Sequence, residues 1–224
     1  LTLVDEGEFE KAIDALTAAI KKNSSIAALW HGLGVALRMQ GDLEQASAAL
    51  ERAIKLDPKN GKTWTALGVI ARLRGNPSLA LQCYEQARRA DFAAVVLLDA
   101  EASAHFDLGE ISKAIGKVDE ALSQSPEYVP AHAMRYEMLF EQGSPIDEAL
   151  APFRQAIEDF PENSALQTAF ASALFSSGRF DETLHVLNHL RVRSDEPALA
   201  ALHAQTLLKL RLPDEALKAL IRSP

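Results

Sequence analysis

The sequence predicts an all-α protein built from repeated antiparallel helix pairs, and three observations carry this prediction. Glycines recur at a nearly constant interval along the chain. Apolar residues recur at helical spacing on both sides of these glycines. No segment shows the alternation of apolar and polar residues that is typical of a half-buried strand.

Composition allows a sizeable core and excludes several classes of partner. The chain has 224 residues, of which 48% are hydrophobic and 24% charged, so it does not resemble a disordered protein. Its net charge of −8 argues against general binding to nucleic acid or docking on an anionic membrane. No apolar run approaches the ~20 residues of a membrane-spanning helix. We therefore expect no nucleic-acid partner and no membrane insertion.

The glycine spacing indicates an internal repeat. Six of the eleven glycines are separated by intervals of 34, 34, 34, 34 and 35 residues: Gly7, Gly41, Gly75, Gly109, Gly143 and Gly178. Glycine suits the left-handed position just after a helix, where a Cβ atom would be penalised. Each of these glycines is therefore expected to end one helix and to lead, through a tight turn, into the next.

Residues 27–60 show one repeat in full. Apolar residues at helical spacing flank the turn glycine on both sides: Trp30, Leu33 and Leu37 before it, and Leu43, Ala46, Leu50 and Ala53 after it. Asp57 and Pro58 should end the second helix, because the residue before a proline avoids the helical region. The repeat is therefore predicted to be helix, turn, helix, turn.

This repeat resembles the tetratricopeptide repeat (TPR) family. The family pattern has Trp at position 4, Leu at 7, Gly at 8, Ala at 20, a large apolar residue at 24, Ala at 27 and Pro at 32. Residues 27–60 match at all seven positions, with Leu at position 24. Residues 61–94 match at six, and Phe92 replaces the proline. Later repeats keep the second-helix positions better than the first-helix positions.

The resemblance implies a right-handed superhelical solenoid of about six and a half repeats, since one repeat cannot bury its apolar face alone. We expect a single array over residues 1–224. Its parts are a partial repeat 1–26, the repeats 27–60, 61–94, 95–128, 129–163 and 164–197, and a partial repeat 198–224. One extra residue in 129–163 accounts for the single interval of 35. The chain lacks an initiator Met and a polar last helix, so we expect a fragment of a longer protein.

The resemblance also implies a concave partner-binding groove, lined by positions 2, 5, 9, 12 and 13 of each first helix. These positions predict a basic region followed by an acidic one, with a phenylalanine at position 12 in three consecutive repeats. The candidate groove residues are Arg38, Lys62, Arg72, Asp99, Phe106, Asp107, Glu137, Phe140, Glu141 and Phe175.

The three phenylalanines admit more than one interpretation. An exposed apolar stripe flanked by charges marks an interaction site. The alternatives are a stripe packed down into the core and a contact with other parts of the same protein. The family's best-known groove grips chaperone tails with Asn at position 9, but Val35, Val69 and Glu137 stand at that position here. A co-chaperone role is therefore not expected.

Repeat 129–163 departs most from the pattern. Glu101 and Arg135 both replace the packed leucine of position 7, one repeat apart. We expect an ion pair between them, the alternative being that Arg135 extends its charge to solvent. Tyr136 replaces the position-8 glycine and should separate or tilt its two helices, so the regularity should break around residues 129–150.

Catalytic and metal-binding signals are weak. Cys83 is the only cysteine, so no internal disulfide can form, and a small core residue is the simpler interpretation than a nucleophile. His185 and His189 have the spacing of metal ligands, but they lack a third ligand and fit a polar outer face. We expect no catalytic residue, no metal and no cofactor.

The sequence therefore predicts a non-catalytic scaffold or adaptor that binds a protein or peptide. One alternative is the substrate-presenting or oligomerising arm of a bacterial enzyme of the glycosyltransferase, sulfotransferase or 2-oxoglutarate oxygenase type. Another is an envelope or secretion assembly factor. A cytoplasmic location is expected, with the periplasm as the alternative. The partner and the oligomeric state cannot be read from the sequence.

Overall fold

The computed structural model describes residues 9–191 and 197–221, and within these ranges the chain is helical and has no strand. The all-α prediction is confirmed. The helices are α2 (Phe9–Lys22), α3 (Ala27–Gln40), α4 (Leu43–Leu56), α5 (Gly61–Leu73), α6 (Pro77–Arg89), α7 (Val95–Asp107), α8 (Ile111–Gln124), α9 (Val129–Glu141), α10 (Ile146–Asp159), α11 (Ser164–Ser176), α12 (Phe180–Arg191), α13 (Pro197–Lys209) and α14 (Pro213–Ile221).

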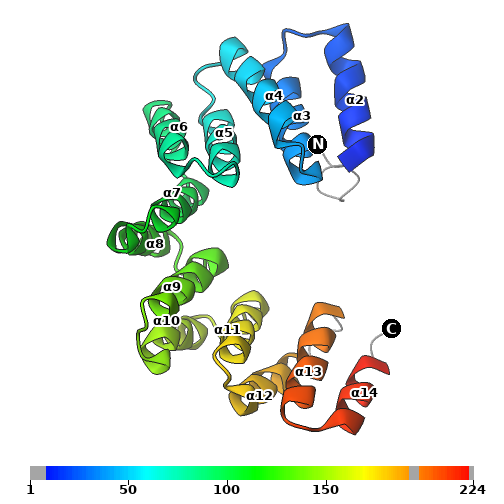
Figure 1. Ribbon diagram of the computed structural model, residues 1–224, viewed down its shortest axis with the longest axis vertical. Coiled ribbons are helices and arrows are strands. Elements are labelled where there is room, and N and C mark those ends of the chain that lie inside the picture. The colour runs from blue at the N-terminus through cyan, green and yellow to red at the C-terminus, as the bar shows by residue number, and fades with distance from the viewer. Residues whose placement is uncertain (1–8, 192–196, 222–224) are drawn as a thin grey trace. The chain divides into compact units, whose positions relative to one another are not determined.

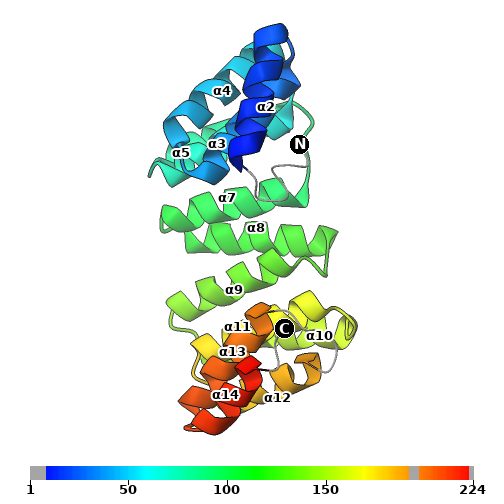
Figure 2. The ribbon, with the colours of Figure 1, turned by 90° about the vertical axis from the view of Figure 1, so that its right-hand side faces the viewer.

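The chain forms two compact units, and the boundary between them falls inside α8. Unit 1 comprises Leu1–Lys117 and unit 2 comprises Val118–Pro224. Within unit 1, α2 packs on α3, α3 on α4, and α5 on α6 (Figure 1). Within unit 2, α9 packs on α10, α11 on α12, and α13 on α14; α13 and α14 stand side by side in Figure 1 and overlap in the view of Figure 2. The assignment of the whole chain to one array stays a prediction.

The predicted helix-ending glycines adopt the left-handed conformation. Within the described residues, Gly41, Gly75, Gly109, Gly143 and Gly178 have φ angles between 71° and 94°. Gly7 lies outside the described residues. At the end of α3, the Gly41 N–H donates to the Arg38 carbonyl and the Asp42 N–H to the Leu37 carbonyl, both at 3.0 Å. These bonds satisfy carbonyl groups that the end of a helix leaves free.

The turn between α13 and α14 reaches the same geometry without glycine. Arg211 has a φ of 64°, a conformation that non-glycine residues adopt at some energetic cost. The N–H groups of Arg211 and Leu212 donate to the carbonyls of Leu208 and Leu207. The tight turn between two antiparallel helices therefore forms here although the sequence has no glycine at the turn.

Short polar side chains begin several of the helices. Asp42, Asn60 and Asn76 precede α4, α5 and α6, and each accepts a hydrogen bond from the backbone N–H three residues later. Such caps satisfy N–H groups that have no partner within the helix. They fix where α5 and α6 start, and thereby the rotation at which each helix presents its side chains.

The glycines at position 8 allow the closest approach within a helix pair. A Cβ atom on Gly34 would lie 2.6 Å from Leu50 Cγ, and one on Gly68 would lie 2.3 Å from Tyr84 Cε1. Leu50 and Tyr84 are fully buried. The small residue at position 8 is therefore required because a large side chain of the second helix occupies the space beside it.

Tyr136 fills the corresponding place in α9 and is buried. Its ring lies 6.5 Å from that of Phe153, and its hydroxyl lies 3.0 Å from Ser176 Oγ. Aromatic rings therefore occupy the space between α9 and α10, and the predicted break in regularity around residues 129–150 stays a prediction.

Candidate functional site

The first helices of unit 1 present the predicted groove positions on one face. Positions 2, 5, 9 and 12 of a repeat lie within about 80° of one another at 100° per residue, so their side chains share one side of α3, α5 or α7. In unit 1 these side chains surround a hollow of about 420 Å³, which we call the α3–α5 hollow. It is lined by His31, Val35, Arg38, Lys62, Thr65, Ala66, Val69, Phe92 and Val96.

The structure thus brings Arg38 and Lys62, two of the predicted groove residues, to one apolar hollow. Lys62 is exposed and Arg38 is half-buried. Burial lowers the pKa of His31, and the positive charge of Lys62 lowers it further, so neutral histidine is favoured. His31 Nδ1 lies 3.0 Å from Thr63 Oγ1. The hollow therefore has an apolar floor and two cations at its edge.

Phe92 is a lining residue that the repeat pattern did not select. It occupies the position near the end of repeat 61–94 where the family has a proline. The sequence pattern predicts only the end of a helix at that position. The α6 helix ends at Arg89, and Asp91 takes a φ of 53° before Phe92. An aromatic residue at a proline position, directly before a first helix, was the signal that could have identified it.

The acidic residues of unit 1 lie beside Arg72. The Arg72 guanidinium donates to Asp107 at 3.1 Å, and both side chains are partly exposed. Burial raises the pKa of Asp99, while the charge of Arg72 opposes that rise. Asp99 Oδ1 is buried and has no hydrogen-bond partner among the described residues. Arg72 is therefore engaged with carboxylates, unlike the two cations that line the α3–α5 hollow.

The three phenylalanines at position 12 do not form a uniformly exposed row. Phe106 in unit 1 and Phe175 in unit 2 are half-buried, and Phe175 packs edge-on against Phe180 with ring centroids 5.4 Å apart. Phe140 is 44% exposed and stacks on Tyr136. Glu137 and Glu141, which flank Phe140 on α9, are also exposed.

The predicted ion pair between Glu101 and Arg135 is corrected by the structure. Glu101 is buried and receives two hydrogen bonds of 2.6 Å from Arg88, and Lys117 lies 3.2 Å away. Arg135 instead pairs with Asp119 at 2.9 Å, within unit 2. Each side chain finds its counter-charge on a second helix of its own unit, whereas the prediction considered only neighbouring first helices.

The remaining chemical candidates lie apart from the α3–α5 hollow. Cys83 is buried, and this burial raises the pKa of its thiol, as expected for a core residue. His185 and His189 are exposed, with ring centroids 4.8 Å apart. Across residues 9–191 and 197–221, no three His, Cys, Asp or Glu side chains gather closely enough to hold a metal ion. The helices of the same ranges include none with the length and apolar character needed to cross a membrane.

The helix pairs with turn glycines and small position-8 residues define a tetratricopeptide-repeat protein. The family model of the cilia and flagella-associated protein 70 C-terminal domain matches residues 2–169, and a tetratricopeptide-repeat model matches residues 139–206. Because the first match covers more than half of the sequence, the chain belongs to this family of tetratricopeptide-repeat domains. No curated protein matches the chain.

Solved structures show the same fold. A chain of the APC/C hetero-tetramer Cut9–Hcn1 matches with a TM-score of 0.67 and 17% identity, over 99% of this chain and 44% of that one. A tetratricopeptide-repeat protein from Parabacteroides merdae matches with a TM-score of 0.68 and 21% identity, over 99% and 88% of the two chains. YrrB, described as having an unusual peptide-binding site, matches with a TM-score of 0.55 and 22% identity, over 88% and 100%.

Proposed function

We propose that this chain is a non-catalytic protein-interaction scaffold, and that the α3–α5 hollow receives a segment of its partner. The observation that carries the proposal is the hollow itself. It is about 420 Å³ in size, and seven of its nine lining residues come from first helices at the positions where the family places its groove. The apolar lining offers contact area, and the polar groups at its edge offer orientation. The solved structures of similar fold support a scaffold role only by analogy.

The charge of the hollow favours an acidic partner segment. Arg38 and Lys62 both line it, and neither is in an ion pair with another described residue. A partner that places an apolar side chain between Val35 and Val69 and a carboxylate near the two cations would satisfy both features. Charge complementarity of this kind gives specificity and faster association more than affinity.

Selection from a peptide library displayed on phage tests this proposal. The wild-type chain should enrich peptides with an apolar residue next to Asp or Glu. Val69→Arg, which fills the hollow with a charged side chain, should abolish the enrichment. Arg38→Glu combined with Lys62→Glu should select basic peptides instead. Lys59→Glu, an exposed charge change on the loop before α5, serves as the matched control.

Two results would contradict the proposal: enrichment that survives Val69→Arg, and enriched sequences that are unaffected by the double charge reversal. A Phe140→Ala arm tests the exposed part of α9 in the same selection. If Phe140→Ala abolishes the enrichment of peptides while Val69→Arg retains it, the binding site lies in unit 2. The α3–α5 hollow does not support either alternative, an enzyme arm or an envelope assembly factor, and both stay predictions.

A further inference from the structure

A second hollow lies on the opposite side of α5 from the α3–α5 hollow. It has a volume of about 620 Å³ and lies between the second helices α4 and α6, with α5 as its floor, so we call it the α4–α6 hollow. It is lined by Ser47, Glu51, Ile54, Lys55, Trp64, Leu67, Ile70, Ala71, Arg74, Asn76, Leu79 and Cys83. Trp64, Leu67 and Ala71 of α5 are spaced as one helical face, opposed to the face that carries Lys62, Thr65 and Val69.

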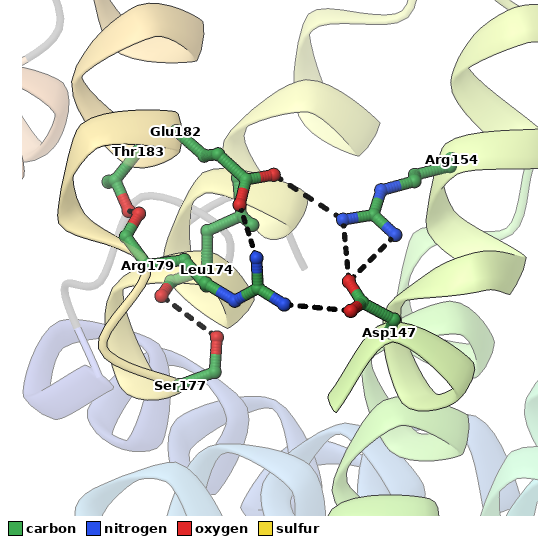
Figure 3. A network of polar contacts seen from close by, with 7 residues as sticks. All are labelled: Asp147, Arg154, Leu174, Ser177, Arg179, Glu182 and Thr183. Atoms are coloured by element: carbon green, nitrogen blue, oxygen red, sulfur yellow. Dashed lines mark hydrogen bonds and ion pairs between the residues drawn. The ribbon is translucent and has the colours of Figure 1, made fainter. Parts of the chain in front are cut away.

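Unit 2 shows how the same place in the repeat can be bridged. The hollow between α10 and α12 is smaller, about 400 Å³, and is lined by Arg154, Glu182 and five other residues. Arg154 on α10 pairs with Glu182 on α12 at 3.3 Å. Asp147 and Arg179 join these two residues in a four-membered network of ion pairs (Figure 3). Here the chain links its two second helices with its own charged side chains.

The described residues of unit 1 have no equivalent ion pair between α4 and α6. In repeat numbering, Arg154 corresponds to Glu51 at position 25, and Glu182 corresponds to Leu79 at position 19. An acid and a leucine cannot pair, and Leu79 is 44% exposed at the edge of the hollow. Ile54 and Trp64 are half-buried, while Ile70 and Cys83 form a buried floor. The site that unit 2 bridges with an ion pair is therefore an open apolar hollow in unit 1.

The charges at the edge of the α4–α6 hollow are partly unsatisfied. Arg74 pairs with Glu44 at 3.0 Å, so its charge is balanced. Glu51 and Lys55 are both exposed, and neither is in an ion pair with another described residue. Glu51 receives only a hydrogen bond from Ser47 at 3.2 Å. The two free charges are of opposite sign and lie one turn apart on α4, about 6 Å along its axis.

We propose that the α4–α6 hollow docks an amphipathic helix of a partner protein, which sets a basic residue against Glu51 and an acidic residue against Lys55. Glu51 holds the place of Arg154, so the partner's basic side chain would supply the counter-charge that Glu182 supplies to Arg154 in unit 2. A helix fits better than an extended peptide, because a helix satisfies its own backbone groups and this lining is mainly apolar. Its apolar face would cover Leu79 and Ile54. This surface is separate from the α3–α5 hollow, so either can fail without the other.

Four helical peptides of ~18 residues, about five turns, can test the proposal on the whole chain. They share one apolar face and differ only at two flanking positions one turn apart, which hold Arg and Glu, two Arg, two Glu or two Gln. Binding is measured by fluorescence anisotropy of the labelled peptide. The wild type should prefer the Arg and Glu peptide by about threefold or more, the scale of one or two exposed ion pairs.

Charge variants make the preference diagnostic regardless of the direction in which the peptide lies. Glu51→Lys leaves two cations and should switch the preference to the doubly acidic peptide. Lys55→Glu leaves two acids and should switch it to the doubly basic peptide. Glu158→Lys, an exposed position of α10 in unit 2, is the matched control and should leave the preference unchanged.

Location is tested with Leu79 and with the single cysteine. Leu79→Ala should weaken binding several-fold, whereas Leu73→Ala, which is 49% exposed but does not line the hollow, should not. Cys83 lines the hollow but is buried, so its reaction with a maleimide requires local opening around the hollow, which the bound peptide should slow. The proposal is overturned if no peptide binds, if the two charge variants do not switch preference, or if Val69→Arg removes binding while Leu79→Ala does not.

Discussion

Glu101 is an acidic side chain held inside unit 1, only 7% exposed, between Arg88 and Lys117. Burial raises the pKa of Glu101, but the hydrogen bonds and charges of Arg88 and Lys117 outweigh this effect, and its pKa lies below the usual value. A folded-state pKa below that of the unfolded chain means that the carboxylate stabilises the fold at neutral pH. This contribution is lost as the pH falls below about 4.3, where the unfolded chain begins to take up the proton.

Glu101→Gln should therefore lower the free energy of unfolding at pH 7 by about 1–3 kcal/mol, which is less than for a fully buried pair because Arg88 is 40% exposed. The difference from wild type should shrink as the pH falls from 4.3 towards 3. Urea unfolding at pH 7 and pH 3 measures both quantities. Glu85→Gln removes an exposed ion pair with Arg89 and should have almost no effect. A difference that stays constant with pH would contradict the assigned role of Glu101.

At the scale of helix pairs, packing depends on what the second helix places beside position 8. Gly68→Ala puts a Cβ atom 2.3 Å from the buried ring of Tyr84, so it should destabilise the chain by about 1–3 kcal/mol despite the higher helix propensity of alanine. Gly116→Ala in α8 meets nothing within 4 Å and should stabilise by about 0.5–1 kcal/mol. Thermal unfolding of both variants checks the contrast. Equal effects would mean that the α5–α6 pair relaxes freely.

The helix pairs also show what a sequence can and cannot predict. The turn glycines were predictable because a left-handed residue is a local requirement, and Gly41 meets it without any distant contact. The ion-pair partners of Glu101 and Arg135 were not predictable, because the pairing depends on how far a long side chain reaches across a helix pair. The α4–α6 hollow was missed for a related reason: it follows from a combination of Glu51 and Leu79 on two different helices.

At the scale of the whole molecule, repeat proteins gain stability from interactions within repeats and between neighbours only. Unit 1 and unit 2 have separate buried clusters, such as that of Leu37, Leu50 and Ile70 and that of Tyr136, Phe153 and Leu174. The boundary at Lys117 and Val118 falls within a continuous helix. If repeats are coupled only to their neighbours, a substitution in one buried cluster should destabilise the adjacent repeats more than it destabilises distant repeats.

Cys83 makes this testable, because it is the only thiol of the chain and is buried in unit 1. Tyr136→Ala removes a buried ring in unit 2 and should cost about 3–5 kcal/mol locally. The urea midpoint followed by circular dichroism should fall, whereas the midpoint for reaction of Cys83 with a thiol reagent should move much less. Leu50→Ala, a buried change in unit 1, should lower both midpoints. If Tyr136→Ala shifts the two midpoints equally, the chain unfolds as a single cooperative body and the neighbour-only description is wrong.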